Sequence, residues 1–188
     1  MSSTADVVIV GGGVVGSSAA WRLRQDGLTG RIVVVERDDT YARASSFLAM
    51  GGIRQQFGSA VCAQMVQYSV RLWREFDTTM RTPTHVPLAW FRPRGYLFLA
   101  DDTNADALTA RESAQRAAGV VQQRLSVDEI RALVPDLWLD DIRFGLFGPE
   151  DGYANRARCC SGSAPRRRTP APSTSATRSR ASRVRAAV

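Results

Sequence analysis

Residues 6–16 read Asp-Val-Val-Ile-Val-Gly-Gly-Gly-Val-Val-Gly, and this stretch decides the fold. Four apolar β-forming residues in a row predict a buried strand of a parallel sheet. Gly11, Gly13 and Gly16 fit the pattern G-x-G-x-x-G, which joins such a strand to a helix. An apolar helical pattern follows from Val14 to Asp26, and Gly27 is placed to end the helix.

The residues after this helix complete a β-α-β unit. Residues 31–35, Arg-Ile-Val-Val-Val, predict a second buried strand that ends at Glu36, twenty residues after Gly16. An acid at that place can accept hydrogen bonds from an adenosine ribose. Strand, glycines, helix, strand and acid in this order predict an α/β fold with a Rossmann-like dinucleotide-binding unit.

Each glycine of the motif has a mechanical role. Gly11 permits a tight turn, Gly13 lets the backbone approach a pyrophosphate, and Gly16 lets helix and strand pack closely. The helix N-terminus then offers free N–H groups and the positive end of its dipole to the phosphates. The pattern therefore predicts where the two phosphates of a dinucleotide would bind.

The segment after Glu36 distinguishes FAD from NAD(P). An NAD enzyme normally runs straight into its next helix–strand unit, whereas here a polar, glycine-bearing segment follows. The run from Val7 to Phe57 closely resembles the D-amino-acid oxidase and sarcosine dehydrogenase group of FAD-dependent amine oxidoreductases. The resemblance continues more loosely through residues 95–98 and 148–153, so it covers about residues 5–155.

The resemblance implies a set of FAD contacts. The pyrophosphate would be held by Gly11, Gly12, Gly13, Val14, Val15 and Gly16. Glu36 would bind the adenosine ribose, and Arg37 would lie beside the adenine. The next loop would contribute Ala44 and Ser45 to the phosphates, and Gly51 and Gly52 would let the backbone pass close to the flavin ring.

Arg54 is the one candidate for a catalytic role. Relatives can place a basic residue there, where it would stabilise a reduced, anionic flavin or bind a substrate carboxylate. The alternative is a surface arginine in a salt bridge. Some relatives attach the flavin covalently through histidine or cysteine. Because the single histidine, His85, lies in a proline-rich loop away from the motifs, we expect non-covalent FAD.

The activity implied by the resemblance is oxidation of an amino-acid amine, of the sarcosine or D-amino-acid type. Hydride passes from a small-molecule amine substrate to the flavin, and water hydrolyses the resulting imine. Two alternatives stay open at this point. One is an incomplete, non-catalytic FAD-binding fragment, and the other is a nucleic-acid-binding protein that uses a basic tail.

The chain is expected to have three parts: an FAD-binding segment at 1–80, the beginning of a mixed α+β substrate domain at 81–155, and a tail at 156–188. An amphipathic helix is predicted over 59–76, with Cys62, Met65 and Trp73 in the core. Further predicted elements are a strand at 96–100, a helix at 105–118, a strand at 120–125, a helix that starts with a capping box at Ser126, and a strand at 142–147.

The tail differs sharply in composition from the rest. Residues 156–188 contain nine arginines and no acid. The positive charge of this tail alone exceeds the net charge of +7 of the whole chain. Three interpretations compete: a disordered linker, a basic nucleic-acid-binding arm and a shifted reading frame. A shift by two bases, with synonymous codons chosen freely, yields a helix followed by a strand, so the sequence favours a frameshift after about residue 155. The arm lacks aromatic residues to stack on bases, so no nucleic-acid partner is expected.

Composition excludes several other classes. No stretch reaches the length of a membrane span, and the N-terminus lacks an export signal, so a cytoplasmic location is expected. The three cysteines, Cys62, Cys159 and Cys160, have no metal-ligand spacing, and no metal site is expected.

Overall fold

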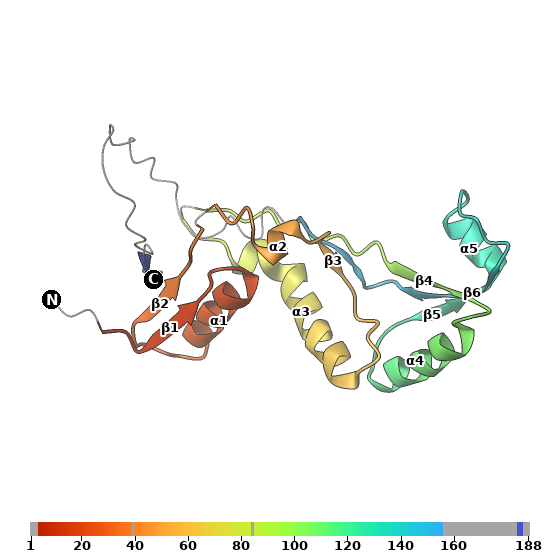
Figure 1. Ribbon diagram of the computed structural model, residues 1–188, viewed down its shortest axis with the longest axis horizontal. Coiled ribbons are helices and arrows are strands. Elements are labelled where there is room, and N and C mark those ends of the chain that lie inside the picture. The colour runs from red at the N-terminus through yellow and green to blue at the C-terminus, as the bar shows by residue number, and fades with distance from the viewer. Residues whose placement is uncertain (1–3, 39, 84, 156–183, 186–188) are drawn as a thin grey trace. The chain divides into compact units, whose positions relative to one another are not determined.

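The computed structural model describes residues 4–38, 40–83, 85–155 and 184–185 (Figure 1). Its contacts group these residues into two compact units. The first unit runs to Met50 and includes Met80–Leu88, and the second comprises Gly51–Thr79 and Ala89–Asn155. These ranges differ from the division expected at residue 80, because the long helix before that point belongs to the second unit. The predictions for the tail lie outside the described residues, except at 184–185.

The first unit is built on the predicted β-α-β arrangement. Strand β1 (Val7–Val10) leads into helix α1 (Val14–Gln25), which is followed by strand β2 (Ile32–Val35). The two strands are parallel, with Val7 opposite Ile32. A short helix, α2 (Ser45–Leu48), follows β2 along the chain. Strand β8 (Val184–Arg185) pairs antiparallel with the edge of β2 that is not paired with β1.

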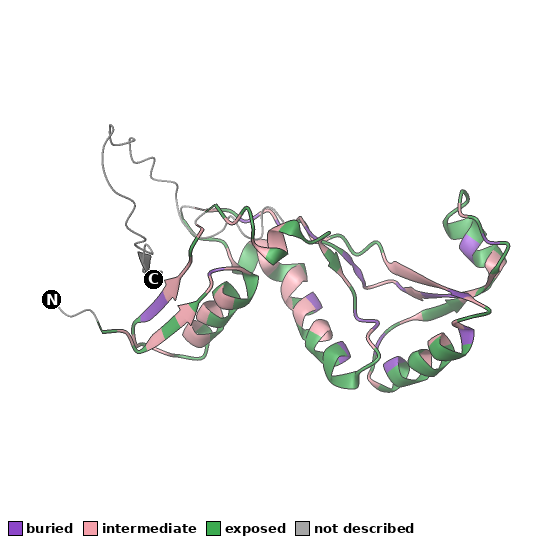
Figure 2. Ribbon diagram, viewed as in Figure 1, coloured by how far each residue is buried: buried purple, intermediate pink, exposed green. Residues whose placement is uncertain are grey.

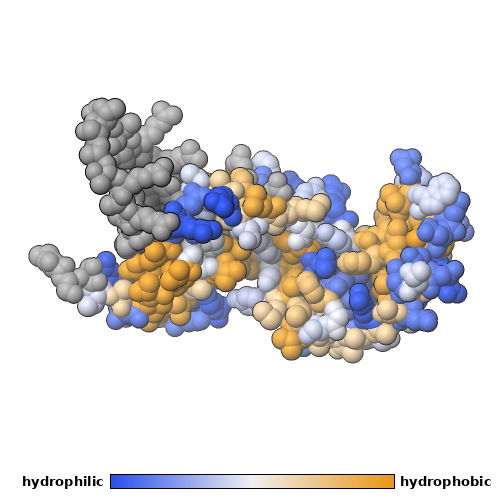
Figure 3. Space-filling view, in the orientation of Figure 1, coloured by the Kyte–Doolittle hydropathy of each residue, from blue (hydrophilic) through white to orange (hydrophobic). Residues whose placement is uncertain are grey.

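The prediction that the first strand is buried is wrong. Val8 and Val10 are 58% and 87% exposed, whereas Ile32 and Val33 of β2 are buried (Figure 2). Alternate residues of a strand face opposite sides, and Ile9 faces α1 close to Gly16. Val8 and Val10 therefore lie on the face that no described helix covers, and apolar side chains gather over β1 and β2 in Figure 3.

The second unit contains an antiparallel sheet in the order β4-β6-β5. Its strands are β4 (Tyr96–Asp101), β5 (Gln123–Leu125) and β6 (Ile142–Gly148), close to the predicted ranges. Helix α4 (Ala105–Ala117) and helix α5 (Val127–Leu133) pack on opposite faces (Figure 1). Ile130 of α5 lies against Gly145 on one face, and Leu108 of α4 lies near Phe98 and Leu146 on the other.

A second, smaller sheet joins distant parts of this unit. Strand β3 (Gly52–Ile53) pairs antiparallel with β7 (Gly152–Tyr153). Tyr153 also forms a bridge to Arg92, with backbone N···O distances of 2.8 and 3.1 Å. The glycine-rich segment that begins at Gly51 is therefore held by backbone hydrogen bonds to residues about one hundred positions later.

Helix α3 (Ala60–Thr79) forms as predicted, but its predicted core face is partly wrong. Cys62 and Met65 are exposed, and Ala63 and Val70 are the buried residues. Trp73 is half-buried and stacks on Phe76 with ring centroids 4.8 Å apart. Periodicity identified the helix correctly, but the partners that cover it decide which stripe is buried.

No helix in the described ranges is long and apolar enough to cross a membrane.

The predicted capping box at Ser126 is present. The Ser126 side chain accepts from the Glu129 backbone N–H, and the Glu129 carboxylate accepts from the Ser126 backbone N–H at 2.7 Å. We expect Ser126→Ala to lower the free energy of unfolding by about 1 kcal/mol, because these terminal N–H groups lose their partners. Urea unfolding would measure the loss. The matched change Ser113→Ala inside α4 should cost less, and equal costs would contradict the capping role.

Candidate dinucleotide-binding site

The glycine loop after β1 has the geometry expected of its sequence. Gly11 has a φ of +97° and donates its N–H to the Val35 carbonyl at 2.8 Å. A Cβ on Gly16 would overlap the Gly11 carbonyl oxygen, so only glycine permits this approach of helix and strand. A Cβ on Gly13, in contrast, would meet nothing within 4 Å. The loop therefore leaves open space beside Gly13, where a ligand could approach the backbone.

The N-terminus of α1 is free to bind an anion. Gly13 is the N-cap residue, no side chain caps the helix, and no acid lies in the first turn. Val14 and Val15, which begin the helix, are exposed. The first N–H groups of a helix have no intrahelical partner, and they carry the positive end of the dipole. Phosphate oxygens are suitable partners for such groups.

Glu36 lies directly after β2 and is bound to the glycine loop. Its Oε2 accepts the Gly12 N–H at 2.7 Å, and its Oε1 accepts the Asp38 N–H at 3.0 Å. The backbone N–H groups of Asp38 and Gly12 hold the pKa of Glu36 below its usual value. A carboxylate offers about four acceptor positions, so about two are left for sugar hydroxyls. The sequence predicted the acid but not its bond to Gly12.

Tyr41 is a residue of this region that the sequence analysis missed. It has a φ of +57°, and its hydroxyl would lie 2.9 Å from a Cβ on Gly12. No motif marks a tyrosine at this place, because the contact depends on how the loop after Glu36 folds back. Of the other residues expected here, Arg37 is exposed after Glu36, Ala44 is the N-cap residue of α2, and Ser45 is its first residue.

The remaining predicted FAD contacts, Gly51 and Gly52, belong to the second unit. Gly51 has a φ of +83°, and its carbonyl accepts the Ala154 N–H at 3.0 Å. A Cβ on Gly52 would lie 2.6 Å from the hydroxyl oxygen of Tyr96. The backbone conformation of Gly51 and the close approach of Tyr96 to Gly52 therefore explain why these two positions are glycine. The expected approach of both residues to the flavin stays a prediction.

Arg54 is exposed, and it forms no salt bridge with any described residue. The alternative of a surface arginine in a salt bridge is therefore not supported within the described residues. Its guanidinium carbon lies 5.1 Å from the ring centroid of Phe57 and 5.4 Å from that of Phe98. Stacking on aromatic rings holds the cation without neutralising its charge. Arg54 is thus available to an anionic ligand, and its role at the flavin or substrate stays a prediction.

Gln55 and Gln56, which follow Arg54 in the sequence, form a buried polar cluster with Asp151 that the sequence did not predict. Asp151, 1% exposed, accepts hydrogen bonds from the Gln55 backbone N–H at 2.8 Å and from the side-chain amides of Gln55 and Gln56 at 3.3 Å. Burial raises the pKa of Asp151, although these hydrogen bonds oppose the effect. The sequence marked this aspartate only as part of a turn.

In the described ranges, no group of His, Cys, Asp and Glu could hold a metal ion.

The parallel β-α-β unit, the uncapped helix N-terminus and the acid after β2 define the class of dinucleotide-binding folds. Residues 6–166 match the family described as "FAD dependent oxidoreductase" (DAO). The chain belongs to this family. The match confirms the sequence-based resemblance to FAD-dependent oxidoreductases of this group.

Curated relatives extend this similarity. The chain is 36% identical over 151 residues to "FAD-dependent oxidoreductase domain-containing protein 1" of Xenopus laevis, covering 78% of the chain and 30% of that protein. It is 26% identical over 161 residues to mitochondrial sarcosine dehydrogenase of Homo sapiens, covering 86% of the chain and 17% of that protein. The chain spans about a third or less of these relatives' own lengths.

Solved structures share the fold. L-proline dehydrogenase from P. horikoshii superimposes with a TM-score of 0.74 at 26% identity, over 86% of this chain and 41% of that one. Glycine oxidase from Geobacillus kaustophilus gives a TM-score of 0.71 at 23% identity, over 84% and 42% of the two chains. The α/β fold with a parallel β-α-β start is therefore that of FAD-dependent oxidoreductases.

Proposed function

We propose that this chain binds FAD non-covalently through the glycine loop, the N-terminus of α1 and Glu36. The observation that carries the proposal is the open space at Gly13 beside an uncapped helix N-terminus. The N–H groups of the first turn would hold the pyrophosphate, and the ionised Glu36 would accept hydrogen bonds from the ribose. The residues present thus fit the adenosine diphosphate portion of FAD.

The reaction proposed is oxidation of an amino-acid amine, with FAD supplying the redox chemistry when bound. Support comes from the family and from relatives whose names give sarcosine and L-proline as substrates, both secondary amino acids. Arg54 supports the same class, because an unpaired guanidinium can bind a substrate carboxylate. Its part would be to bind and orient the substrate.

Gly13→Val tests the cofactor proposal. The new side chain would occupy the space left for the pyrophosphate, so we expect the dissociation constant for FAD to rise at least tenfold. Calorimetric titration of the flavin-free chain with FAD would measure it, and circular dichroism should show an unchanged fold. Gly58→Val is the matched control, because a Cβ there also meets nothing within 4 Å. Equal FAD affinity in both variants would contradict the proposal.

A second candidate is FAD binding without turnover. It is favoured by the small share of the relatives that the chain covers, 30% for the Xenopus laevis protein. Turnover of sarcosine or of a D-amino acid by the FAD-loaded chain, measured with an artificial electron acceptor, separates the two candidates. Sustained turnover would support the oxidoreductase, and FAD binding with no turnover would support the second candidate.

A further inference from the structure

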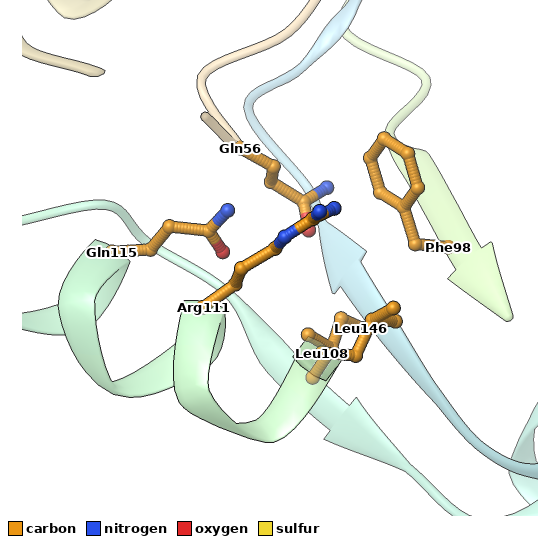
Figure 4. A pocket seen from close by; sticks show the side chains of 6 residues that line it. All are labelled: Gln56, Phe98, Leu108, Arg111, Gln115 and Leu146. Atoms are coloured by element: carbon orange, nitrogen blue, oxygen red, sulfur yellow. The ribbon is translucent and has the colours of Figure 1, made fainter. Parts of the chain in front are cut away.

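A pocket of about 320 Å³ lies in the second unit, at the end of strand β7. The described residues that line it are Trp90, Arg92, Tyr153 and Asn155. Small-molecule sites span about 300–1,000 Å³, so this volume suits a ligand of one or two rings. Another pocket, between α4 and the sheet that contains β4 and β6, has only about 30 Å³, which is room for water alone (Figure 4).

The side chains that line the larger pocket come from two paired segments of backbone. Arg92 and Tyr153 exchange backbone hydrogen bonds at 2.8 and 3.1 Å, and residues paired in this way project from the same face of a sheet. Trp90 and Asn155 lie two positions from them along the two segments. The Trp90 and Tyr153 side chains, which are 47% and 52% exposed, therefore border the same cavity as the Arg92 guanidinium.

Trp90 is held in a backbone conformation that tryptophan rarely adopts. Its φ is +48°, which is strained for a bulky side chain. A regular antiparallel ladder would pair Asn155 with Trp90, yet the Asn155 N–H donates to the Ala89 carbonyl at 2.6 Å, so Trp90 is an extra residue, as in a β-bulge. Asp77 holds this turn by accepting the N–H groups of Ala89 and Trp90 at 2.7 and 3.2 Å. Bulges and strained residues recur at ligand sites because they re-aim a side chain.

The pocket also contains a positive charge. Arg92 is exposed and forms no ion pair within the described part of the chain. The acids that contact or adjoin the two segments have other partners: Asp77 accepts the two backbone N–H groups, Asp151 lies in its buried cluster, and Glu150 pairs with Arg74 at 3.2 Å. A guanidinium group matches the geometry of a carboxylate, so the charge favours a ligand that carries one.

We propose that this pocket binds an aromatic carboxylate, of about the size of phenylacetate. The ring of the ligand lies against the Trp90 and Tyr153 side chains, because offset or edge-to-face contacts between aromatic rings are favourable. Its carboxylate pairs with Arg92. This inference goes beyond the proposed function, since it requires neither flavin nor an amine.

Three ligands of similar size test the two parts of this recognition. The flavin-free chain is titrated calorimetrically with phenylacetate, with phenylacetamide, which lacks the charge, and with cyclohexylacetate, which lacks the aromatic ring. We expect saturable binding of phenylacetate and at least tenfold weaker binding of the amide. Cyclohexylacetate should bind about threefold to tenfold more weakly than phenylacetate. No binding of phenylacetate, or equal binding of phenylacetate and either analogue, would overturn the proposal.

Variants locate the binding in this pocket. Arg92→Gln should weaken phenylacetate binding at least tenfold, and Arg94→Gln is the matched control, because Arg94 is also exposed but does not line the pocket. Trp90→Asn should also weaken binding, since asparagine tolerates a positive φ but removes the ring. Circular dichroism checks that both pocket variants are folded. Unchanged affinity in the Arg92 variant, or an equal loss in the Arg94 variant, would overturn the proposal.

Two further titrations separate this proposal from the proposed function. The Gly13→Val chain should bind phenylacetate as tightly as the unchanged chain, because Gly13 belongs to the other unit. A chain that binds phenylacetate but not FAD would contradict the proposed function and support the pocket, and a chain that binds FAD but not phenylacetate would do the reverse. Sarcosine should not displace phenylacetate, because its methyl groups gain little from the two rings, and displacement would overturn the proposal.

Discussion

Gly16→Ala is expected to destabilise the first unit strongly. The added Cβ would overlap the Gly11 carbonyl oxygen and would also lie 3.1 Å from Ile9 Cγ2. Neither the backbone of the glycine loop nor the start of α1 can move without disturbing the β-α-β packing. We expect a loss of about 3 kcal/mol in the free energy of unfolding, measured by urea titration with circular dichroism. FAD binding should be lost with it, because the strand and the helix N-terminus separate.

The matched control is Gly13→Ala, three residues earlier in the same motif. Its Cβ meets nothing within 4 Å, and the residue has an ordinary φ of −63°. Its effect on unfolding should therefore stay within about 0.5–1 kcal/mol, with either sign. If the two alanine variants unfolded at the same urea concentration, the close packing of helix and strand at Gly16 would not exist in solution.

Asp151→Ala is expected to have a comparably large effect on the second unit. The change removes the acceptor for the Gln55 backbone N–H and for two side-chain amides, all in a buried place. Leaving these donors unpaired should cost about 3 kcal/mol. Urea unfolding would measure this cost, and Asp102→Ala, at a side chain that is 87% exposed, should cost less than about 1 kcal/mol.

The cost of Asp151→Ala should also depend on pH. Burial raises the pKa of Asp151 above the value of 3.8 expected for an unfolded chain, so the folded state binds this proton more tightly. The resulting stabilisation is fully present below the unfolded pKa and is lost as pH rises through the folded pKa. The difference between the two chains should therefore be larger near pH 4 than at pH 8. A difference that grew with pH would contradict the raised pKa.

Local patterns predicted the elements well, and tertiary contacts decided their burial. The ranges of α1, β4, α4 and the Ser126 capping box follow from turn, cap and periodicity rules that act within a few residues. Burial of β1 and of the Met65 side of α3 was predicted wrongly, because a strand or helix buries only the face that another element covers. The sequence pattern shows that a face is apolar, but it does not show what packs on it.

The candidate sites divide in the same way. The glycine motif and Glu36 could be identified from the sequence, because phosphate and ribose recognition needs these residue types at fixed spacing along one β-α-β unit. The bond from Glu36 to Gly12 and the support of the Gln55 segment by Asp151 could not be identified in this way. Each joins residues whose separation along the chain follows no local period. The sequence by itself thus determined the family and the cofactor-binding motif, whereas only the tertiary structure decided which polar groups are buried together and which lack a partner.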